Sequence, residues 1–388
     1  MLPITQNYVD LPLPTPDALA HSARLSARIH EAIHGAGGRI PFSRYMELAL
    51  YAPGLGYYSA GARKFGAAGD FITAPELSPL FSRCLARQCA EVLDGVEGGS
   101  ILELGAGSGI MAADMLLELQ ALDSLPEEYL ILEVSAELKE RQRATLAAKV
   151  PGFAAKIRWL DALPGRFTGV IVGNEVLDAL PVERFRRAAG DYEEYCVRSE
   201  GEGFAWTTRP AGEQLAAALA ALETTLPAPL AAGYESEICL GAASLVASLA
   251  ACLARGALLL LDYGYPRAAY YHPERSMGTL MCHYRQRAHG DPFLYPGLQD
   301  ITAHVDFTAV AEAGTGAGLE LAGYTTQAHF LMALGIAGLA DTGMRAAQQV
   351  KLLTLPEEMG ERFKAIGFTR GVDASLQGFA LRDLTRTL

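Results

Sequence analysis

The sequence lacks any apolar run long enough to cross a membrane, which takes about 18 to 20 residues. Its longest candidate, "GALLLLDYGY", is interrupted at Asp262 and has the length of a buried strand. The opening "MLPITQNYVDLPLPTPDALAHSARL" lacks the basic-then-apolar order of a secretion signal and the Arg-rich, acid-poor composition of an organelle presequence. We therefore expect a cytoplasmic protein without a membrane span.

Basic residues are in deficit, since 32 Lys and Arg stand against 44 Asp and Glu, giving a formal net charge of -12. A chain of this charge lacks the broad basic face that displaces counterions from a nucleic-acid backbone. Nucleic acid is therefore not an expected partner, and only a local basic groove is compatible with the composition.

Closely spaced cysteines are also absent, which argues against a disulfide framework and a zinc site. Buried free thiols are expected instead. His283, His289 and His304 form no pair with the i, i+4 spacing of the HExxH zinc motif, so we expect no metal. The six cysteines are Cys84, Cys89, Cys196, Cys239, Cys252 and Cys282.

From Ser100 onward the sequence alternates short apolar runs with helix-length stretches such as "AELKERQRATLAAKV". The runs are continuously apolar, which is typical of a parallel sheet covered by helices on both faces. This pattern predicts the α/β class. The predicted strands are "ILELG", "YLILEVS", "IRWLDA", "GVIVGNEVLD" and "GALLLLDYG".

We expect a helical N-terminal region over residues 1–95 and an α/β core over residues 96–388. Many glycines and prolines from Pro53 to Pro79 predict a long ordered loop, of a length usually functional or mobile. Two insertions interrupt the core. Period-two alternation predicts a β-hairpin within 183–232, and a loop-rich stretch at about 266–310 predicts a lid over one end of the sheet.

Three glycines follow the first strand of the core in "ILELGAGSGIMAADML". Gly105, Gly107 and Gly109 form GxGxG, and Ile110 stands where the dinucleotide fingerprint GxGxxG has its third glycine. Glycines here allow a tight turn and close approach of a ligand, and the following helix offers unpaired N–H groups. A carboxylate or a phosphate fits this loop.

An acidic residue accompanies each of the first three core strands. Glu103 lies in the first, Glu133 ends the second and Asp161 ends the third. A carboxylate at the second position accepts both ribose hydroxyls of an adenosine in doubly wound folds, and the third is placed to meet the adenine amino group. This order resembles the class I S-adenosylmethionine methyltransferases, which implies a Rossmann-like core and S-adenosyl-L-methionine as cofactor.

The fourth strand ends in "NEVLDALPV", with Asn174, Glu175 and Asp178 where ligands bind in this fold. Two carboxylates this close stay ionised when a cation lies between them, and a guanidinium meets that need. Glu175 is then the candidate for orienting the guanidinium and accepting its proton, with Asp178 as second carboxylate. The alternative is a helix N-terminus capped by Asn174.

Several blocks in order, between about Arg39 and Arg370, resemble the MidA-like methyltransferases. That family includes the mitochondrial protein-arginine methyltransferase that assists respiratory complex I assembly. The resemblance implies arginine methylation of a protein, with a complex I subunit as one suggested acceptor. The blocks are "GDFITAPELSPLF", "NEVLDALPV", "LDYGY", "GTL" followed by "PGLQDITAHVDFT", and "TQAHFL".

The resemblance also implies roles for individual residues. Gly105, Gly107 and Glu133 belong to the donor site, and Glu175 and Asp178 face the acceptor. Asn174 is a donor-site candidate from its position at the end of the fourth strand. Asp70, Thr73 and Glu76 would close over the site, Glu76 on the substrate side.

Two further residues are candidates for the acceptor pocket. Tyr263 offers a cation–π face or simply packs at a strand end. His304 lines the pocket or satisfies a carboxylate such as Asp306.

Other functions remain open on sequence alone. One is methylation of a small molecule or of another residue, and another is a donor-binding assembly protein with little turnover. A nicotinamide-dependent dehydrogenase is disfavoured by Ile110. The sequence leaves the acceptor, the number of methyl groups added and the oligomeric state open, an oligomer included.

Overall fold

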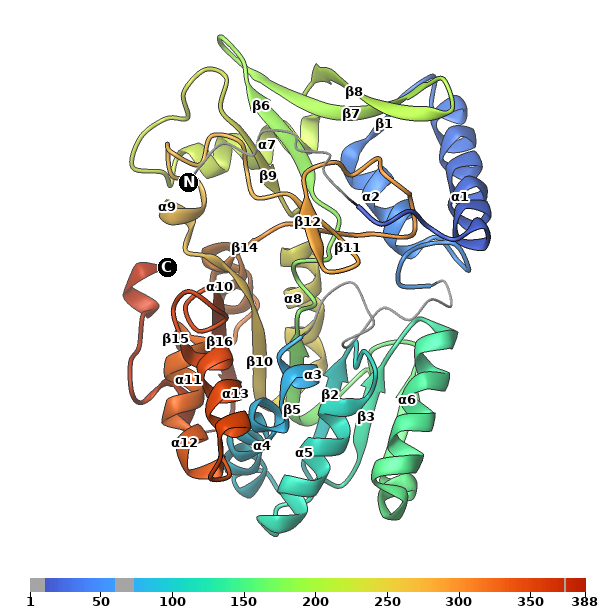
Figure 1. The fold of residues 1–388 in the computed structure, drawn as a ribbon. Helices are drawn as coiled ribbons and strands as arrows, with labels where there is room; N and C mark the ends of the chain where they lie inside the picture. Colours follow the sequence, from blue (N-terminus) through green and yellow to red (C-terminus); the bar gives the residue numbers. More distant parts are fainter. Residues whose placement is uncertain (1–10, 60–72, 373–374) are drawn as a thin grey trace. The chain divides into compact units, whose positions relative to one another are not determined.

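The computed structural model describes residues 11–59, 73–372 and 375–388, which form two compact units (Figure 1). We call them the core unit and the insert unit. The core unit comprises Ile72–Leu177, Ala242–Pro266 and Val305–Leu388. The insert unit comprises the described parts of Met1–Phe71 together with Asp178–Gly241 and Arg267–His304.

The core unit contains an eight-stranded sheet in the order β15-β16-β10-β5-β2-β3-β4, with β14 paired to β10. Strands β4, β3, β2, β5 and β10 run parallel, as expected, whereas β16 runs antiparallel to both its neighbours. The sheet is therefore mixed. The strands are β2 (Ser100–Leu104), β3 (Tyr129–Leu132), β4 (Ile157–Leu160), β5 (Phe167–Asn174), β10 (Leu253–Tyr265), β14 (Val305–Asp306), β15 (Glu320–Thr326) and β16 (Phe363–Arg370).

Helices cover both faces of this sheet. Apolar residues of α4, α5, α11, α12 and α13 join one core cluster with alternate residues of the strands. On the other face, a Cβ on Gly314 of α10 would meet the ring of Phe368 on β16 at 2.4 Å, so this helix packs closely. The helices are α3 (Ala74–Leu77), α4 (Pro79–Asp94), α5 (Ile110–Ala121), α6 (Ala136–Lys149), η1 (Pro151–Lys156), α8 (Leu240–Cys252), α10 (Phe307–Gly316), α11 (Gln327–Ala333), α12 (Ile336–Leu339), α13 (Met344–Thr354), η2 (Gln377–Phe379) and η3 (Thr385–Thr387).

The boundary between the units differs from the expected division at residue 95. Helix α4 begins at Pro79 behind the cap Ser78, whose hydroxyl accepts from the amide of Leu80. Its residues Phe81 and Leu85 are fully buried in the cluster shared with the core strands. Burying two such side chains contributes about 1.5 to 3 kcal/mol each, so α4 belongs to the core.

The insert unit contains a five-stranded antiparallel sheet instead of the single expected hairpin. Strands β7 and β8 form a hairpin, and β6, β9 and β1 extend it. The hairpin prediction missed β1 and β9 because they come from distant parts of the chain. The strands are β1 (Ile40–Pro41), β6 (Glu183–Arg187), β7 (Tyr192–Glu200), β8 (Gly203–Pro210) and β9 (Glu235–Ile238), and a smaller sheet holds β11 (Met281–Tyr284), β12 (Arg287–His289) and β13 (Asp300–Thr302).

Two helices of the insert unit, Pro16–Gly35 and Phe42–Tyr51, pack on these strands through one apolar cluster. In α1, buried Leu25, Ile29 and Ile33 recur every four residues, which places them on one helical face. Thr15 caps this helix by accepting from the amide of Ala18 at 3.3 Å. The helices are α1 (Pro16–Gly35), α2 (Phe42–Tyr51), α7 (Glu213–Glu223) and α9 (Arg267–Tyr270).

Among the described residues, no helix has the length and apolarity that crossing a membrane requires. All six cysteines are free thiols, and all are buried except the half-buried Cys239. Burial raises the pKa of Cys84 to about 12, which keeps its sulfur protonated and unreactive.

Candidate functional site

The carboxyl ends of the parallel strands meet at one edge of the core sheet. In the strand register, Leu104 lies beside Leu132 on one side and Gly173 on the other. The residues that follow these strand positions therefore form a row along the edge, where ligands bind in folds of this class. The row consists of Asp161 after β4, Glu133 after β3, Gly105 after β2 and Asn174 at the end of β5.

The glycine loop connects β2 to α5. Gly105, Gly107 and Gly109 all have positive φ, at 60°, 52° and 82°, a conformation that is costly for residues with a side chain. Among the described residues, a Cβ on Gly105 would meet only Val176, at 3.9 Å. The loop thus leaves its backbone open on that side, as the sequence predicts for a ligand that approaches closely.

Glu103 lies in β2, two residues before the loop, and is only 1% exposed. The hydroxyl of Tyr129 donates to its carboxylate at 2.7 Å. Burial raises the pKa of Glu103 to about 7, the tyrosine bond opposes the rise, and the charge of Glu133 adds to it. Its partner in the structure is therefore a core tyrosine, and its donor-binding role remains a prediction.

Glu133 is the buried carboxylate of the row. Its Oε1 accepts from the amide of Ser135 at 2.9 Å and its Oε2 from Nε2 of Gln142 at 3.0 Å. Burial raises the pKa of Glu133, and these two bonds oppose the rise. The backbone amide of Val134 adds a third bond that also opposes the rise, and the carboxylate keeps accepting capacity for a hydroxyl group of a ligand.

Asp161 lies next in the row and is 91% exposed. Its carboxylate pairs with the ammonium of Lys139 on α6, whose hydrogen bond lowers the pKa of Asp161. Val134, directly after Glu133, exposes 78% of its surface although it is apolar. A flat apolar ring seated on Val134 would cover this surface, a signal that the sequence analysis missed.

Asn174 and Glu175 end β5 at the other side of the glycine loop. Glu175 has φ of 53°, rare for a residue with a side chain, and its amide donates to the carbonyl of Leu261 at 2.9 Å. Asn174 donates from Nδ2 to Glu175 Oε1 at 3.0 Å, while its Oδ1 is buried and accepts nothing from the described residues. Backbone strain of this kind concentrates at functional sites.

The alternative reading of this segment, a capped helix N-terminus, is wrong, because turns follow β5 instead of a helix. Asp262, at the carboxyl end of β10, holds these turns in place. Its Oδ2 accepts from the amide of Leu177 at 2.9 Å and its Oδ1 from that of Tyr263 at 2.8 Å, with 1% of the residue exposed. A long-range bond thus fixes the backbone beside Glu175.

The segment before α4 also reaches the glycine loop. Glu76 of α3 accepts a hydrogen bond from the hydroxyl of Ser108, between the second and third glycines. The carbonyl of Thr73 accepts from the amide of Leu77 at 3.0 Å, which starts α3. The structure therefore brings Glu76 to the predicted donor loop, while its role toward a substrate remains a prediction. Asp70 lies outside the described residues.

Tyr263 packs its ring against Phe363 with 5.4 Å between centroids. This contact agrees with the interpretation of Tyr263 as a packing residue at a strand end. Lys364 lies over the ring of Tyr265 at 5.7 Å, so that neighbouring ring already faces a cation of the protein itself.

Asp178 and His304 belong to the insert unit, where the chain brings them close. The carbonyl of Asp178 accepts from the amide of Ala303 at 3.0 Å, and the amide of His304 donates to Thr279 Oγ1 at 3.1 Å. Asp178 is 6% exposed, and it contributes with Asp300 to the raised pKa of Tyr58, whose main cause is burial. Their acceptor-side roles remain predictions.

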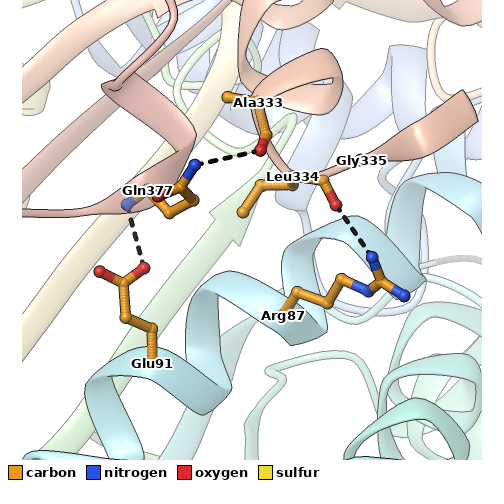
Figure 2. Close-up of a pocket in the computed structure, with 6 residues that line it drawn as sticks. All are labelled: Arg87, Glu91, Ala333, Leu334, Gly335 and Gln377. Atoms are coloured by element: carbon orange, nitrogen blue, oxygen red, sulfur yellow. Dashed lines mark hydrogen bonds between the residues drawn. The ribbon is translucent and has the colours of Figure 1, made fainter. Parts of the chain in front are cut away.

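A separate hollow of about 600 Å³ lies beside the C-terminal half of α4 (Figure 2). Polar groups around it bond to one another: Arg87 donates to the carbonyl of Leu334 at 3.3 Å, and the backbone amide of Gln377 donates to Glu91 at 3.0 Å. Figure 2 marks both bonds. None of the predicted site residues lines it. The hollow therefore carries no part of the predicted chemistry.

Two residues that contact the site were missed by the sequence analysis. Gln142 bonds to both Glu133 and the carbonyl of Gly107, and Trp159 donates to Gln142. A polar residue within the buried stripe Leu138–Gln142–Leu146 was the available signal. Within the ranges that the structure describes, no group of three His, Cys, Asp or Glu residues is arranged to hold a metal.

Comparison with known proteins adds a family and solved relatives. Residues 84–325 match the family described as "Putative S-adenosyl-L-methionine-dependent methyltransferase". A crystal structure from Burkholderia thailandensis, bound to S-adenosyl-homocysteine, is 50% identical with a TM-score of 0.93, covering 98% of this chain and 100% of that one. A native structure from the same organism is 49% identical with a TM-score of 0.89, covering 98% and 100%.

More distant relatives carry a named activity. The "Protein arginine methyltransferase NDUFAF7, mitochondrial" of Danio rerio is 30% identical over 370 residues, covering 85% of this chain and 83% of the relative. The Homo sapiens protein of the same name is 27% identical over 371 residues, covering 84% and 79%.

Proposed function

We propose that this chain, which belongs to the family of S-adenosyl-L-methionine-dependent methyltransferases, methylates arginine side chains of a protein. The cofactor follows from the family, whereas the arginine acceptor is our proposal. It is supported by the name of relatives such as the Danio rerio protein and by the placement of Glu175. A subunit of respiratory complex I is the first protein acceptor to test.

The residues along the sheet edge fit the cofactor. Glu133 is a buried carboxylate that can accept from the ribose hydroxyls, and exposed Val134 offers a surface for the adenine ring. Of the residues that the structure places, only Val176 comes within 4 Å of a Cβ on Gly105, so the glycine loop leaves room beside its backbone. The buried Oδ1 of Asn174 is an acceptor for the ammonium group of the methionine end.

When bound, S-adenosyl-L-methionine supplies an electrophilic methyl group on its sulfonium, so the protein need only position the acceptor and remove a proton. The observation that carries the arginine proposal is Glu175, a carboxylate held in a strained conformation beside the donor residues. We assign it the orientation of the guanidinium and the acceptance of the proton that the methylated nitrogen releases. Asp178, three residues further along the chain, is the proposed second carboxylate.

The proposal is tested by incubating the purified chain with tritiated donor and a peptide digest of its host's proteins, followed by acid hydrolysis. Label in methylarginine supports it. Label in methyllysine or in a small molecule overturns the arginine acceptor. Donor binding without label anywhere favours an assembly protein.

Glu175→Gln should lower methyl transfer by about 100-fold or more while leaving donor affinity intact, because the amide cannot accept the proton. Glu128→Gln is the control, since Glu128 pairs with Arg158 at the surface. Loss of donor binding in Glu175→Gln would contradict the assigned role.

A further inference from the structure

The inner face of α6 contains one polar residue among apolar ones. Leu138, Gln142 and Leu146 follow each other at four-residue spacing and are buried, with Gln142 fully inaccessible. A buried amide is costly unless its hydrogen bonds are made, so an apolar residue would serve packing better here. The amide must therefore be explained by its partners.

The partners of Gln142 fix the orientation of its amide. Nε2 donates to Glu133 Oε2 at 3.0 Å and to the carbonyl of Gly107 at 3.2 Å, both of which can only accept. Oε1 accepts from the indole N–H of Trp159 at 2.9 Å, which can only donate. A flipped amide would lose all three bonds, so the assignment is unique.

These bonds join two halves of the donor site that come from different strands. Gly107 belongs to the loop after β2, and Glu133 follows β3. The helix itself lies close, because a Cβ on Gly109 would be 3.1 Å from Gln142 Cα. We propose that Gln142 is a positioning residue that locks the glycine loop and the ribose-binding carboxylate into one preformed donor site, with Trp159 holding the amide in place.

The hydrogen bond from Gln142 also affects the pKa of Glu133, which can be measured. Burial raises the pKa of Glu133, and the amides of Ser135 and Gln142 oppose that rise. Of the charged groups around it, Lys139 lowers its pKa, and Glu103 interacts with it as a second buried acid. Removing the Gln142 amide leaves the carboxylate less stabilised, so it takes up a proton at a higher pH than in the wild type.

The test is calorimetric titration with S-adenosyl-homocysteine, which needs no methyl acceptor. Gln142→Met keeps the length of the side chain and removes its donors, and it should weaken binding about tenfold at pH 7.5, the effect of one lost bond to a charged group. The matched control is Gln88→Met. Gln88 is equally buried and bridges Glu91 and the amide of Gly378 with bonds of 2.7 Å.

The pH profile separates positioning from packing. Between pH 5.5 and 8.5, the affinity for S-adenosyl-homocysteine should fall as the pH decreases, and in Gln142→Met this fall should begin at a higher pH than in the wild type. Gln88→Met should follow the wild-type curve. Equal weakening by both variants, or unchanged affinity in Gln142→Met, would overturn the proposal.

If Gln142→Met does not fold, a second variant tests the proposal. Trp159→Phe keeps an aromatic ring at this position and removes the indole N–H, which leaves Gln142 Oε1 without its donor. We expect a smaller loss, about threefold in affinity, as befits a neutral hydrogen bond. Unchanged affinity in Trp159→Phe would then reject the lock. Failure of the arginine proposal would leave all these binding results unaffected.

Discussion

Replacing Glu103 with glutamine isolates the electrostatic cost of one buried acid in the donor region. The glutamine oxygen can still accept from Tyr129, which donates at 2.7 Å in the wild type, so this hydrogen bond is kept and the charge is removed, while an amide NH2 group replaces the second oxygen. The carboxyl is 1% exposed, and burial raises its pKa from 4.5 to about 7.

The sign follows from proton linkage. Between pH 4.5 and 7 the folded protein holds a proton at Glu103 that the unfolded chain has lost, so the stability contributed by this group falls as pH rises. Each pH unit corresponds to about 1.4 kcal/mol, so the full interval costs on the order of 3 kcal/mol. Above pH 7 that cost is fully present, and below pH 4.5 it vanishes.

Glu103→Gln should therefore raise the free energy of unfolding by up to about 3 kcal/mol at pH 8 and change it little at pH 4.5. Urea unfolding at both pH values measures the difference, with Glu128→Gln as surface control. An equal gain at both pH values, or no gain at pH 8, would refute this reasoning. A parallel titration with S-adenosyl-homocysteine tests the predicted contribution of Glu103 to donor binding.

Two further substitutions test the site. Gly107→Val should abolish measurable donor binding, at least a 100-fold loss by calorimetry, because valine is strained at φ of 52° and fills space the donor needs; an unchanged affinity would contradict the loop assignment. Asp262→Asn should cost about 1 to 3 kcal/mol in urea unfolding, since one of the two backbone N–H groups it accepts from loses its partner. The same variant should lower turnover more than donor affinity, because the turn beside Glu175 loosens, and equal loss of both would argue against a positioning effect.

The sequence predicted those parts of the fold that depend on local pattern. The continuously apolar strands and the glycine loop after β2 are found where expected, and the family match confirms the methyltransferase class. The antiparallel β16 and the division of the N-terminal region were not predicted. Both depend on which distant segments pack together, as in the burial of Phe81 against the core strands.

Long-range bonds explain what the sequence could not show at the site. Turns follow β5 because Asp262, 85 positions away from Leu177, accepts from its backbone, whereas the local pattern was equally compatible with a capped helix. The hydrogen-bond partners of Gln142 lie 9, 17 and 35 positions away in the sequence. Only their contact in the folded protein explains why the amide is buried. Composition and residue spacing do not predict such long-range contacts.

The insertion between β5 and β10 also has a consequence for synthesis of the protein. One edge of β5 pairs with β10, which begins at Leu253. This edge therefore stays unpaired until the ribosome has made the whole segment Asp178–Gly241 and then β10. At about 5 to 20 residues per second, the ribosome takes roughly 3 to 13 seconds to synthesise Asp178–Gly241. During that interval a nascent chain carries an apolar strand with an open edge, the kind of surface that chaperones shield from aggregation.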